Sequence, residues 1–169
     1  MIISNYQDIS IVYHQMNPID RTDAKILEQL QRDGRLSHVE LAERVGLSPT
    51  PCTRRVRRLE QAGIIRGYAA ILDPKRVGQN VAAYIQIKLE RHTDDVIERF
   101  RRTLEERPEV VAAHAMTGEM DFLLQVVVPD LDALGRFTLH QLLKLPGVRD
   151  VRSSLVLETL KASAPVPIG

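Results

Sequence analysis

Cysteine, long apolar runs and net charge are all scarce in this sequence of 169 residues. A single cysteine, Cys52, excludes an internal disulfide framework and a zinc site built from several cysteines. No run of about 18 apolar residues occurs, which excludes a membrane-spanning helix. Residues 1–14 lack the basic start, apolar core and cleavage site of a signal peptide. We therefore expect a cytoplasmic protein.

The sequence also lacks the motifs of common enzymes. Its five histidines are scattered and form no H-E-x-x-H pattern, and no Walker-type glycine loop occurs. No motif brings a nucleophile, a base and an orienting group together. We therefore expect a non-enzyme without a metal or a resident cofactor.

What the sequence does contain is a globular composition with one concentrated basic segment. Hydrophobic residues make up 44% and charged residues 27%, which is typical of a folded chain, and the net charge is only +1. Between residues 48 and 68 the arginines face a single acidic residue, Glu60. Such a segment indicates a local anionic partner, and a solvated helix face is the alternative. The arginines are Arg54, Arg55, Arg57, Arg58 and Arg66.

The first part of the chain has the start and stop signals of short helices. Asp20 can cap a helix over about 21–32. Ser37 and Glu40 have the spacing of a capping box, and Gly46 ends the second helix. These signals predict two helices followed by a tight turn.

A third helix is predicted from Ser48, as its N-cap, to Gly63. Pro49 takes the first helical position, where its missing N–H costs nothing. At about 100° per residue, one face of this helix is apolar and the other is basic. The apolar side chains are Cys52, Val56 and Leu59; the opposite side carries Thr50, Arg54, Arg57, Arg58 and Gln61, flanked by Thr53 and Arg55.

Two helices joined by a short turn, the second with outward Thr and Arg side chains, predict a helix-turn-helix. The major groove of DNA admits one helix, Arg can pair with guanine or phosphate, and Ser or Thr can reach either. A purely structural helical bundle is the alternative. The candidate DNA-binding residues are Ser48, Thr50, Thr53, Arg54, Arg55, Arg57 and Arg58.

The chain then changes character. Branched residues over 64–72 suggest a strand, such as a short wing, and Asp73-Pro74 and Gly78 mark a linker. We place the DNA-binding domain at 17–72, the linker at 73–80, a second domain at 81–161 and a C-terminal tail at 162–169. Residues 1–15 lack helical or strand periodicity. We expect residues 1–16 to be an unstructured extension; the alternative is that the native protein starts at Met16.

The second half alternates between strand and helix patterns in the order β-α-β-β-α-β, which predicts a ferredoxin-like domain. Two helices can cover only one face of its sheet. We expect Ile or Val-type side chains on the other face and a homodimer formed through this domain. The predicted strands are 83–89, 110–116, 122–128 and 148–157, and the helices are 96–104 and 129–145.

These segments resemble one family of proteins. The run VGLSPTPC-x-RRV-x-RLE, then GEMDFLL and LPGVRDV, are similar to the Lrp/AsnC (leucine-responsive regulatory protein/AsnC) transcription factors over about residues 17–161. The resemblance implies an α+β protein: a winged helix-turn-helix followed by a ferredoxin-like RAM domain that senses an amino acid. It further implies a nucleoid-associated regulator of amino-acid metabolism or transport, whose homodimers associate to tetramers or octamers.

Gly118 to Asp121 join two predicted strands, and a plain hairpin turn is one interpretation of them. The resemblance instead implies an amino-acid-binding loop. Backbone N–H groups can bind an α-carboxylate, and Asp121 can pair with an α-ammonium group. The final strand can contribute. Ser154 is small where some members of the family carry a bulky aromatic residue, so a leucine-type specificity is not carried over to this chain. The candidate effector residues are Met116, Thr117, Gly118, Glu119, Met120, Asp121, Ser154 and Val156.

An architectural DNA-binding protein without an amino-acid effector is the main alternative. It would share the helix-turn-helix and the oligomer. It would bind DNA broadly and with strong salt dependence, whereas a regulator changes its affinity or assembly when an amino acid is added.

Overall fold

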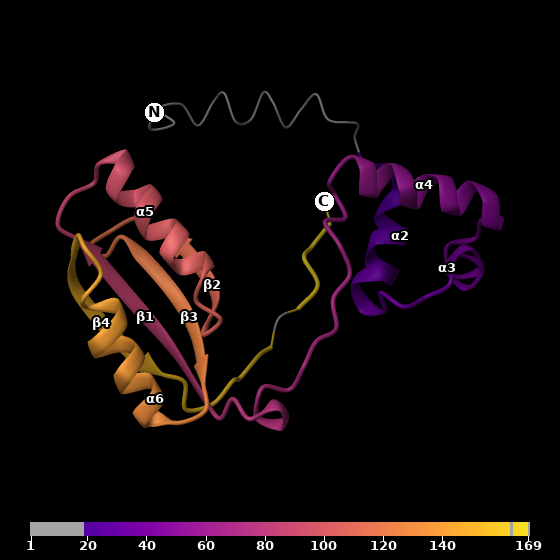
Figure 1. The fold of residues 1–169 in the computed structure, drawn as a ribbon. Coiled ribbons are helices and arrows are strands. Elements are labelled where there is room, and N and C mark those ends of the chain that lie inside the picture. The colour runs from indigo at the N-terminus through magenta and orange to yellow at the C-terminus, as the bar shows by residue number, and fades with distance from the viewer. Residues whose placement is uncertain (1–18, 163, 169) are drawn as a thin grey trace. The chain divides into compact units, whose positions relative to one another are not determined.

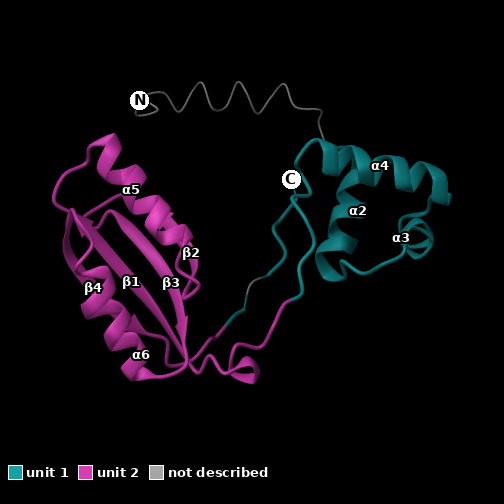
Figure 2. Cartoon of the chain, in the orientation of Figure 1, with its two compact units in different colours: residues 1–70, 161–169 teal, residues 71–160 magenta. Residues whose placement is uncertain are grey.

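The computed structural model describes residues 19–162 and 164–168 (Figure 1). The chain forms two compact units (Figure 2). The first extends to Ala70 and includes the segment from Lys161 onward; the second is Ile71–Leu160. The second unit thus begins before the predicted linker 73–80, and the predicted tail 162–169 belongs to the DNA-binding unit. The predicted extension 1–16 lies outside the described residues.

Among the described residues of the first unit the three predicted helices form: α2 (Arg21–Arg32), α3 (His38–Val45) and α4 (Pro49–Gln61). Capping boxes begin α2 at Asp20 and α3 at Ser37. Ser48 stands at the N-cap of α4, but its side chain makes no capping hydrogen bond. The core beneath the helices contains Ile26, Leu27, Leu41, Ala42, Val45, Cys52, Val56 and Leu59.

Cys52 is fully buried in this core. Burial raises the pKa of the Cys52 thiol, which disfavours the reactive thiolate. Its role is packing, as the helical pattern predicted.

The predicted strand over residues 64–72 is wrong. This segment is an extended coil without strand pairing. Branched residues favour a strand only where they fit a half-buried sheet, and here only Ile65 packs against the helical core. Ile71 is 97% exposed and Leu72 64% exposed. No wing strand therefore forms in this part of the described chain.

The C-terminal segment packs on the same helical core. The Gln31 side chain donates to the Val166 carbonyl oxygen at 3.0 Å and accepts from the Val166 N–H at 2.5 Å. Ile168 is partly buried against the core. A groove of about 470 Å³ holds these contacts, with Leu27, Leu30 and the 64–68 segment as its other walls.

The second unit is a four-stranded antiparallel sheet in the order β2-β3-β1-β4, with both helical segments on one face (Figure 1). This confirms the predicted ferredoxin-like topology. The short helix η1 (Lys75–Val77) precedes it. The elements are β1 (Val81–Leu89), α5 (Asp94–Glu105), β2 (Val110–Ala115), β3 (Phe122–Val128), α6 (Leu131–Gly135) continued by the π-helical η2 (Arg136–Leu142), and β4 (Val148–Leu155).

Alternate strand residues face the helices and form the core. Ile85, Ile87 and Leu124 are fully buried there, beneath Phe100 of α5 and Phe137 of η2. The open face carries a Val-type side chain at some strand positions, as expected, and polar side chains at others. Strand register places Leu123 and Val127 there among polar neighbours: Gln86, Gln125, Arg152 and Ser154, together with Tyr84.

No helix in the described part of the chain is long and apolar enough to cross a membrane. Across the same residues, no cluster of three or more His, Cys, Asp or Glu side chains is arranged to hold a metal ion.

Candidate DNA-binding surface and effector loop

The outward side of α4 is a shallow, basic groove of about 630 Å³. Arg54 and Arg57 are exposed on it, and neither forms an ion pair within the described residues. Their guanidinium groups are therefore available to an external anion. The groove is lined by Pro49, Thr50, Thr53, Arg54, Arg57, Arg58 and Gln61.

Two arginines of α4 instead bind α2. Arg55 Nη1 lies 2.6 Å from Asp20 Oδ2 and 2.9 Å from Asp23 Oδ1. Arg58 pairs with the second oxygen of Asp23, whose side chain is 1% exposed. A buried carboxylate is stable only when paired, so this cluster fixes the orientation of α4 on α2.

The same cluster shifts the ionisation of its members. The hydrogen bond from the Asp23 N–H, followed by that from Arg55, lowers the pKa of Asp20. The bonds to Asp20 and Asp23 raise the pKa of Arg55. Asp20 and Arg55 are therefore both charged at neutral pH. Sequence reasoning missed Asp23, because its partners on α4 are more than thirty positions away.

Thr53 is bonded within the protein. Its hydroxyl group donates to the Pro49 carbonyl oxygen at 2.9 Å, one turn earlier in α4. The hydroxyl oxygen of Thr53 also lies 2.7 Å from His38 Nδ1 at the start of α3. Thr50 remains exposed at the first turn of α4.

The predicted effector loop connects β2 to β3. The Met116 N–H donates to the Asp121 carbonyl oxygen at 2.8 Å and closes the hairpin. Gly118 has a φ of +112°, a conformation that L side chains rarely adopt. Thr117, Gly118 and Glu119 are exposed, whereas Met120 is buried. The backbone at the tip of this loop is thus open to a ligand.

Asp121 anchors the loop to β1. Its Oδ1 accepts from Lys88 Nζ at 2.9 Å, and its Oδ2 accepts from the Leu89 N–H at 2.7 Å and contacts His92 Nε2 at 2.9 Å. The backbone pairing of β3 with β1 ends at Ile87. The Asp121 carboxylate therefore accepts the Leu89 N–H in place of a backbone carbonyl of β3. We expected Asp121 to pair with an α-ammonium group; both of its oxygens already have protein partners.

The pKa of Asp121 reflects this environment. Burial raises it, but the hydrogen bonds from the Leu89 N–H, Lys88 and His92 lower it by more, to about 2. The carboxylate is therefore ionised at neutral pH. Lys88 and His92 were not singled out from the sequence, because only the fold brings the end of β1 to this loop.

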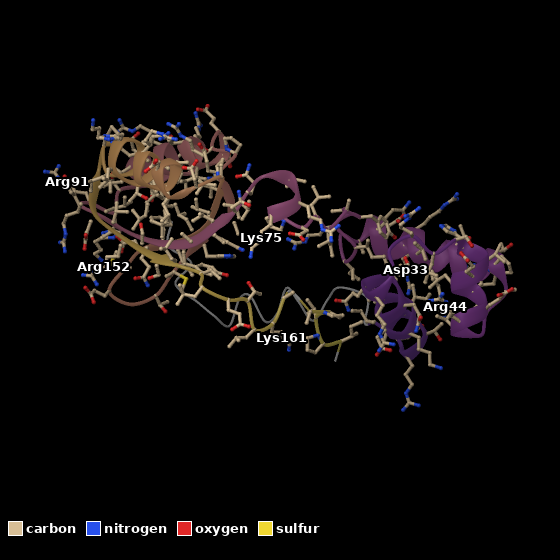
Figure 3. All side chains as sticks on the ribbon, turned by 90° about the horizontal axis from the view of Figure 1, so that it is seen from below. Asp33, Arg44, Lys75, Arg91, Arg152 and Lys161 are labelled. Atoms are coloured by element: carbon tan, nitrogen blue, oxygen red, sulfur yellow. The ribbon has the colours of Figure 1, made fainter. Side chains whose placement is uncertain are left out.

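Arg152 of β4 reaches the same loop. Its Nη2 lies 2.8 Å from Glu119 Oε1, and its side chain is 53% exposed (labelled in Figure 3). Ser154 lies on the same face, opposite Tyr84 of β1, and the Val156 N–H donates to the Ala82 carbonyl oxygen at 2.9 Å. Sequence reasoning missed Arg152, although its spacing of two residues from Ser154 places both on one face of a strand.

Known protein families match both units of the chain. Residues 19–66 match the family model described as winged helix-turn-helix DNA-binding, and residues 82–166 match the Lrp/AsnC ligand binding domain. The leucine-responsive regulatory protein of Escherichia coli (strain K12) is 45% identical over 145 residues, which cover 86% of this chain and 88% of that protein.

Solved structures show the same relationship. A transcriptional regulator from Neisseria meningitidis, in complex with L-methionine, has a TM-score of 0.83 and 46% identity, covering 88% of this chain and 96% of that one. AsnC of Escherichia coli has a TM-score of 0.78 and 29% identity, covering 88% and 98%. These relatives are regulators rather than enzymes. The chain therefore belongs to the Lrp/AsnC family of DNA-binding transcriptional regulators.

Proposed function

We propose that this regulator inserts α4 into the major groove of its operator, and that an amino acid bound at the 116–121 loop modulates the complex. The observation that carries the DNA-binding part is the division of the α4 arginines into two sets. Arg55 and Arg58 hold the helix through Asp23, while Arg54 and Arg57 face the open groove. The first pair positions the helix and the second pair is free to contact DNA.

A dimer presents two such helices to one duplex. Their spacing is expected to be about 34 Å, one turn of DNA, or a multiple of it. Arg54 and Arg57 then contact guanine or phosphate, and Thr50 lies at the first turn of α4, beside the bases or the backbone. Ser48 precedes the first turn of α4, where the Thr50 N–H, between Pro49 and Pro51, can bind a phosphate.

The test compares Arg54→Ala and Arg57→Ala with Arg102→Ala. Arg102 is 74% exposed on α5 in the second unit, so its loss removes the same charge away from the groove. The probe is a short duplex that the wild-type protein selects from a random-sequence pool. Each groove variant should lose about ten- to hundredfold in affinity, the value of a good arginine contact. Wild-type affinity for both groove variants would refute this placement of α4.

The effector class follows from the loop and its surroundings. The open backbone of residues 117–119 and the guanidinium group of Arg152 can bind an α-carboxylate. Met116, 48% exposed, offers apolar contact to a side chain. Asp121 anchors the loop rather than binding the ligand. We therefore place a hydrophobic amino acid such as methionine here, with Ser154 and Val156 on the adjoining strand.

Two relatives support this class: one crystallised with L-methionine, the other is called leucine-responsive. Calorimetry with L-methionine, L-leucine and L-aspartate tests it. The first two should bind, and Arg152→Gln should weaken binding. Arg149→Gln, an exposed arginine of the same strand, should not. No heat with methionine or leucine would contradict this effector class, and no heat with any of the twenty amino acids would favour an architectural protein.

The proposed homodimer and its further association are supported by apolar side chains that the isolated second unit leaves in solvent. Ile71 is 97% exposed, Leu157 96% and Leu160 89%. Because β1 and β4 are antiparallel, the segments that precede β1 and follow β4 leave the sheet at the same end. Large apolar side chains that are this exposed favour an interface. Sedimentation of the wild type and of Leu157→Ser tests this: the variant should shift toward smaller species.

A further inference from the structure

One hydrogen bond joins α3 and α4 at the exposed surface of the helix-turn-helix. His38 Nδ1 lies 2.7 Å from Thr53 Oγ1, which donates to the Pro49 carbonyl oxygen at 2.9 Å. A hydroxyl group carries one proton. With that proton on the Pro49 carbonyl, Thr53 Oγ1 accepts its second bond from His38. In this arrangement of protons, His38 carries a proton on Nδ1 and donates it to Thr53.

This arrangement changes what Thr53 can do. Its hydroxyl group has no proton left to donate to a DNA phosphate or to a base acceptor. The two bonds also hold the side chain in one of the two rotamers that threonine otherwise populates in helices. Thr53 is left with its methyl group for contact, which suits the C5-methyl group of thymine.

The free polar group at this point of the surface belongs to His38. Its side chain is exposed, and Nε2 has no hydrogen-bond partner among the described residues. Arg54 and Arg57 lie on α4 beside Thr53 and line the same groove. The nearest acidic group on α3, Glu40, accepts the Ser37 N–H at 2.9 Å. The surroundings of the imidazole thus favour an anion.

We propose that His38 is a further DNA-binding and specificity-determining residue of this regulator. Its Nδ1–H holds Thr53 in one rotamer, and its Nε2–H contacts a backbone phosphate of the duplex that α4 reads. With a proton on both nitrogens the bound imidazole is a cation, the form that a neighbouring phosphate stabilises. This inference rests on the proposed placement of α4 in the major groove. It assigns to His38 the polar contact that the sequence alone assigned to Thr53.

The experiment measures affinity for the selected duplex and for poly(dI-dC), which reports non-specific binding. His38→Ala should bind the selected duplex about tenfold more weakly, the effect of losing a hydrogen bond to a charged group. The slope of log affinity against log salt should fall by about one, as for a lost phosphate contact. His38→Asn should restore most of the affinity, because its amide offers one proton to Thr53 and one to phosphate.

Thr53→Val tests the coupling. It keeps the shape of the side chain but removes the hydroxyl group, and it should lower the ratio of specific to non-specific affinity. The double variant His38→Ala/Thr53→Val should lose less binding free energy than the sum of the two single losses, because both substitutions break the same His38–Thr53 contact.

Three outcomes separate the possibilities. If His38→Ala binds like the wild type while Arg54→Ala does not, His38 has no role and the placement of α4 stands. If Arg54→Ala and Arg57→Ala also bind normally, the placement itself fails. If His38→Ala lowers the melting temperature, and His38→Asn restores that temperature but not the affinity, the histidine is structural and the proposal is overturned.

Discussion

Replacing Asp121 with asparagine should destabilise the second unit in a pH-dependent way. The substitution keeps the shape of the side chain but removes the charge that Lys88 Nζ, the Leu89 N–H and His92 stabilise. The pKa of the carboxyl group falls from 3.8 to about 2 in the folded protein. At about 1.4 kcal/mol per pH unit, this corresponds to about 2 to 3 kcal/mol of stability at neutral pH.

The sign follows from the direction of the change. A carboxyl group with a lowered folded-state pKa stabilises the fold above its unfolded pKa, and this stabilisation is lost as the pH falls from about 4 to about 2. Urea denaturation followed by circular dichroism, at several pH values in this range and at pH 7, measures the difference between wild type and Asp121→Asn. The difference should be about 2 to 3 kcal/mol at pH 7 and should shrink toward pH 2.

Asp150→Asn is the matched control, because Asp150 is 43% exposed on the same sheet. Its effect should stay within about 0.5 kcal/mol. A difference for Asp121→Asn that is equally large at pH 2 and pH 7 would refute the electrostatic reasoning. No difference at any pH would show that the carboxylate is not an anchor of the loop.

Three other perturbations have defined outcomes. Asp23→Asn leaves Arg55 and Arg58 without their buried partner and should cost about 3 kcal/mol, measured by urea denaturation; Asp33→Asn is an exposed control. Gly147→Ala places a Cβ 2.9 Å from Val96 Cγ1 at a φ of +86° and should cost about 1 to 3 kcal/mol; an unchanged melting temperature would contradict this. Removing residues 164–169 should speed hydrogen exchange of the α2 amides, while those of the β-sheet stay protected.

Periodicity and caps were enough to predict the elements that depend on local signals. The predicted helix over 21–32 coincides with α2, because the cap at Asp20 and the apolar spacing of Ile26 and Leu27 agree. The predicted strand 122–128 coincides with β3. The prediction of a wing strand was wrong, because residues 64–72 have branched side chains but no neighbouring strand to pair with.

The roles within each site depended on contacts that no sequence pattern contains. Arg55 and Arg58 look as basic as Arg54 and Arg57 along the helix, and only the buried Asp23 separates them. Asp121 stands in a motif that suggests a ligand contact, yet its carboxylate completes the hydrogen bonding of β1. Long-range pairs of this kind appear only after the chain is folded.

The packing of Val166 and Ile168 on α2 also has a consequence for synthesis of the chain. The ribosome makes the three helices first, then the whole sheet, and only afterwards the segment that fills the groove beside Leu27 and Leu30. Until then this apolar groove is exposed to solvent or to a chaperone. A messenger RNA truncated after β4 therefore yields a chain with a complete sheet, but its first unit lacks the C-terminal segment that lines this groove.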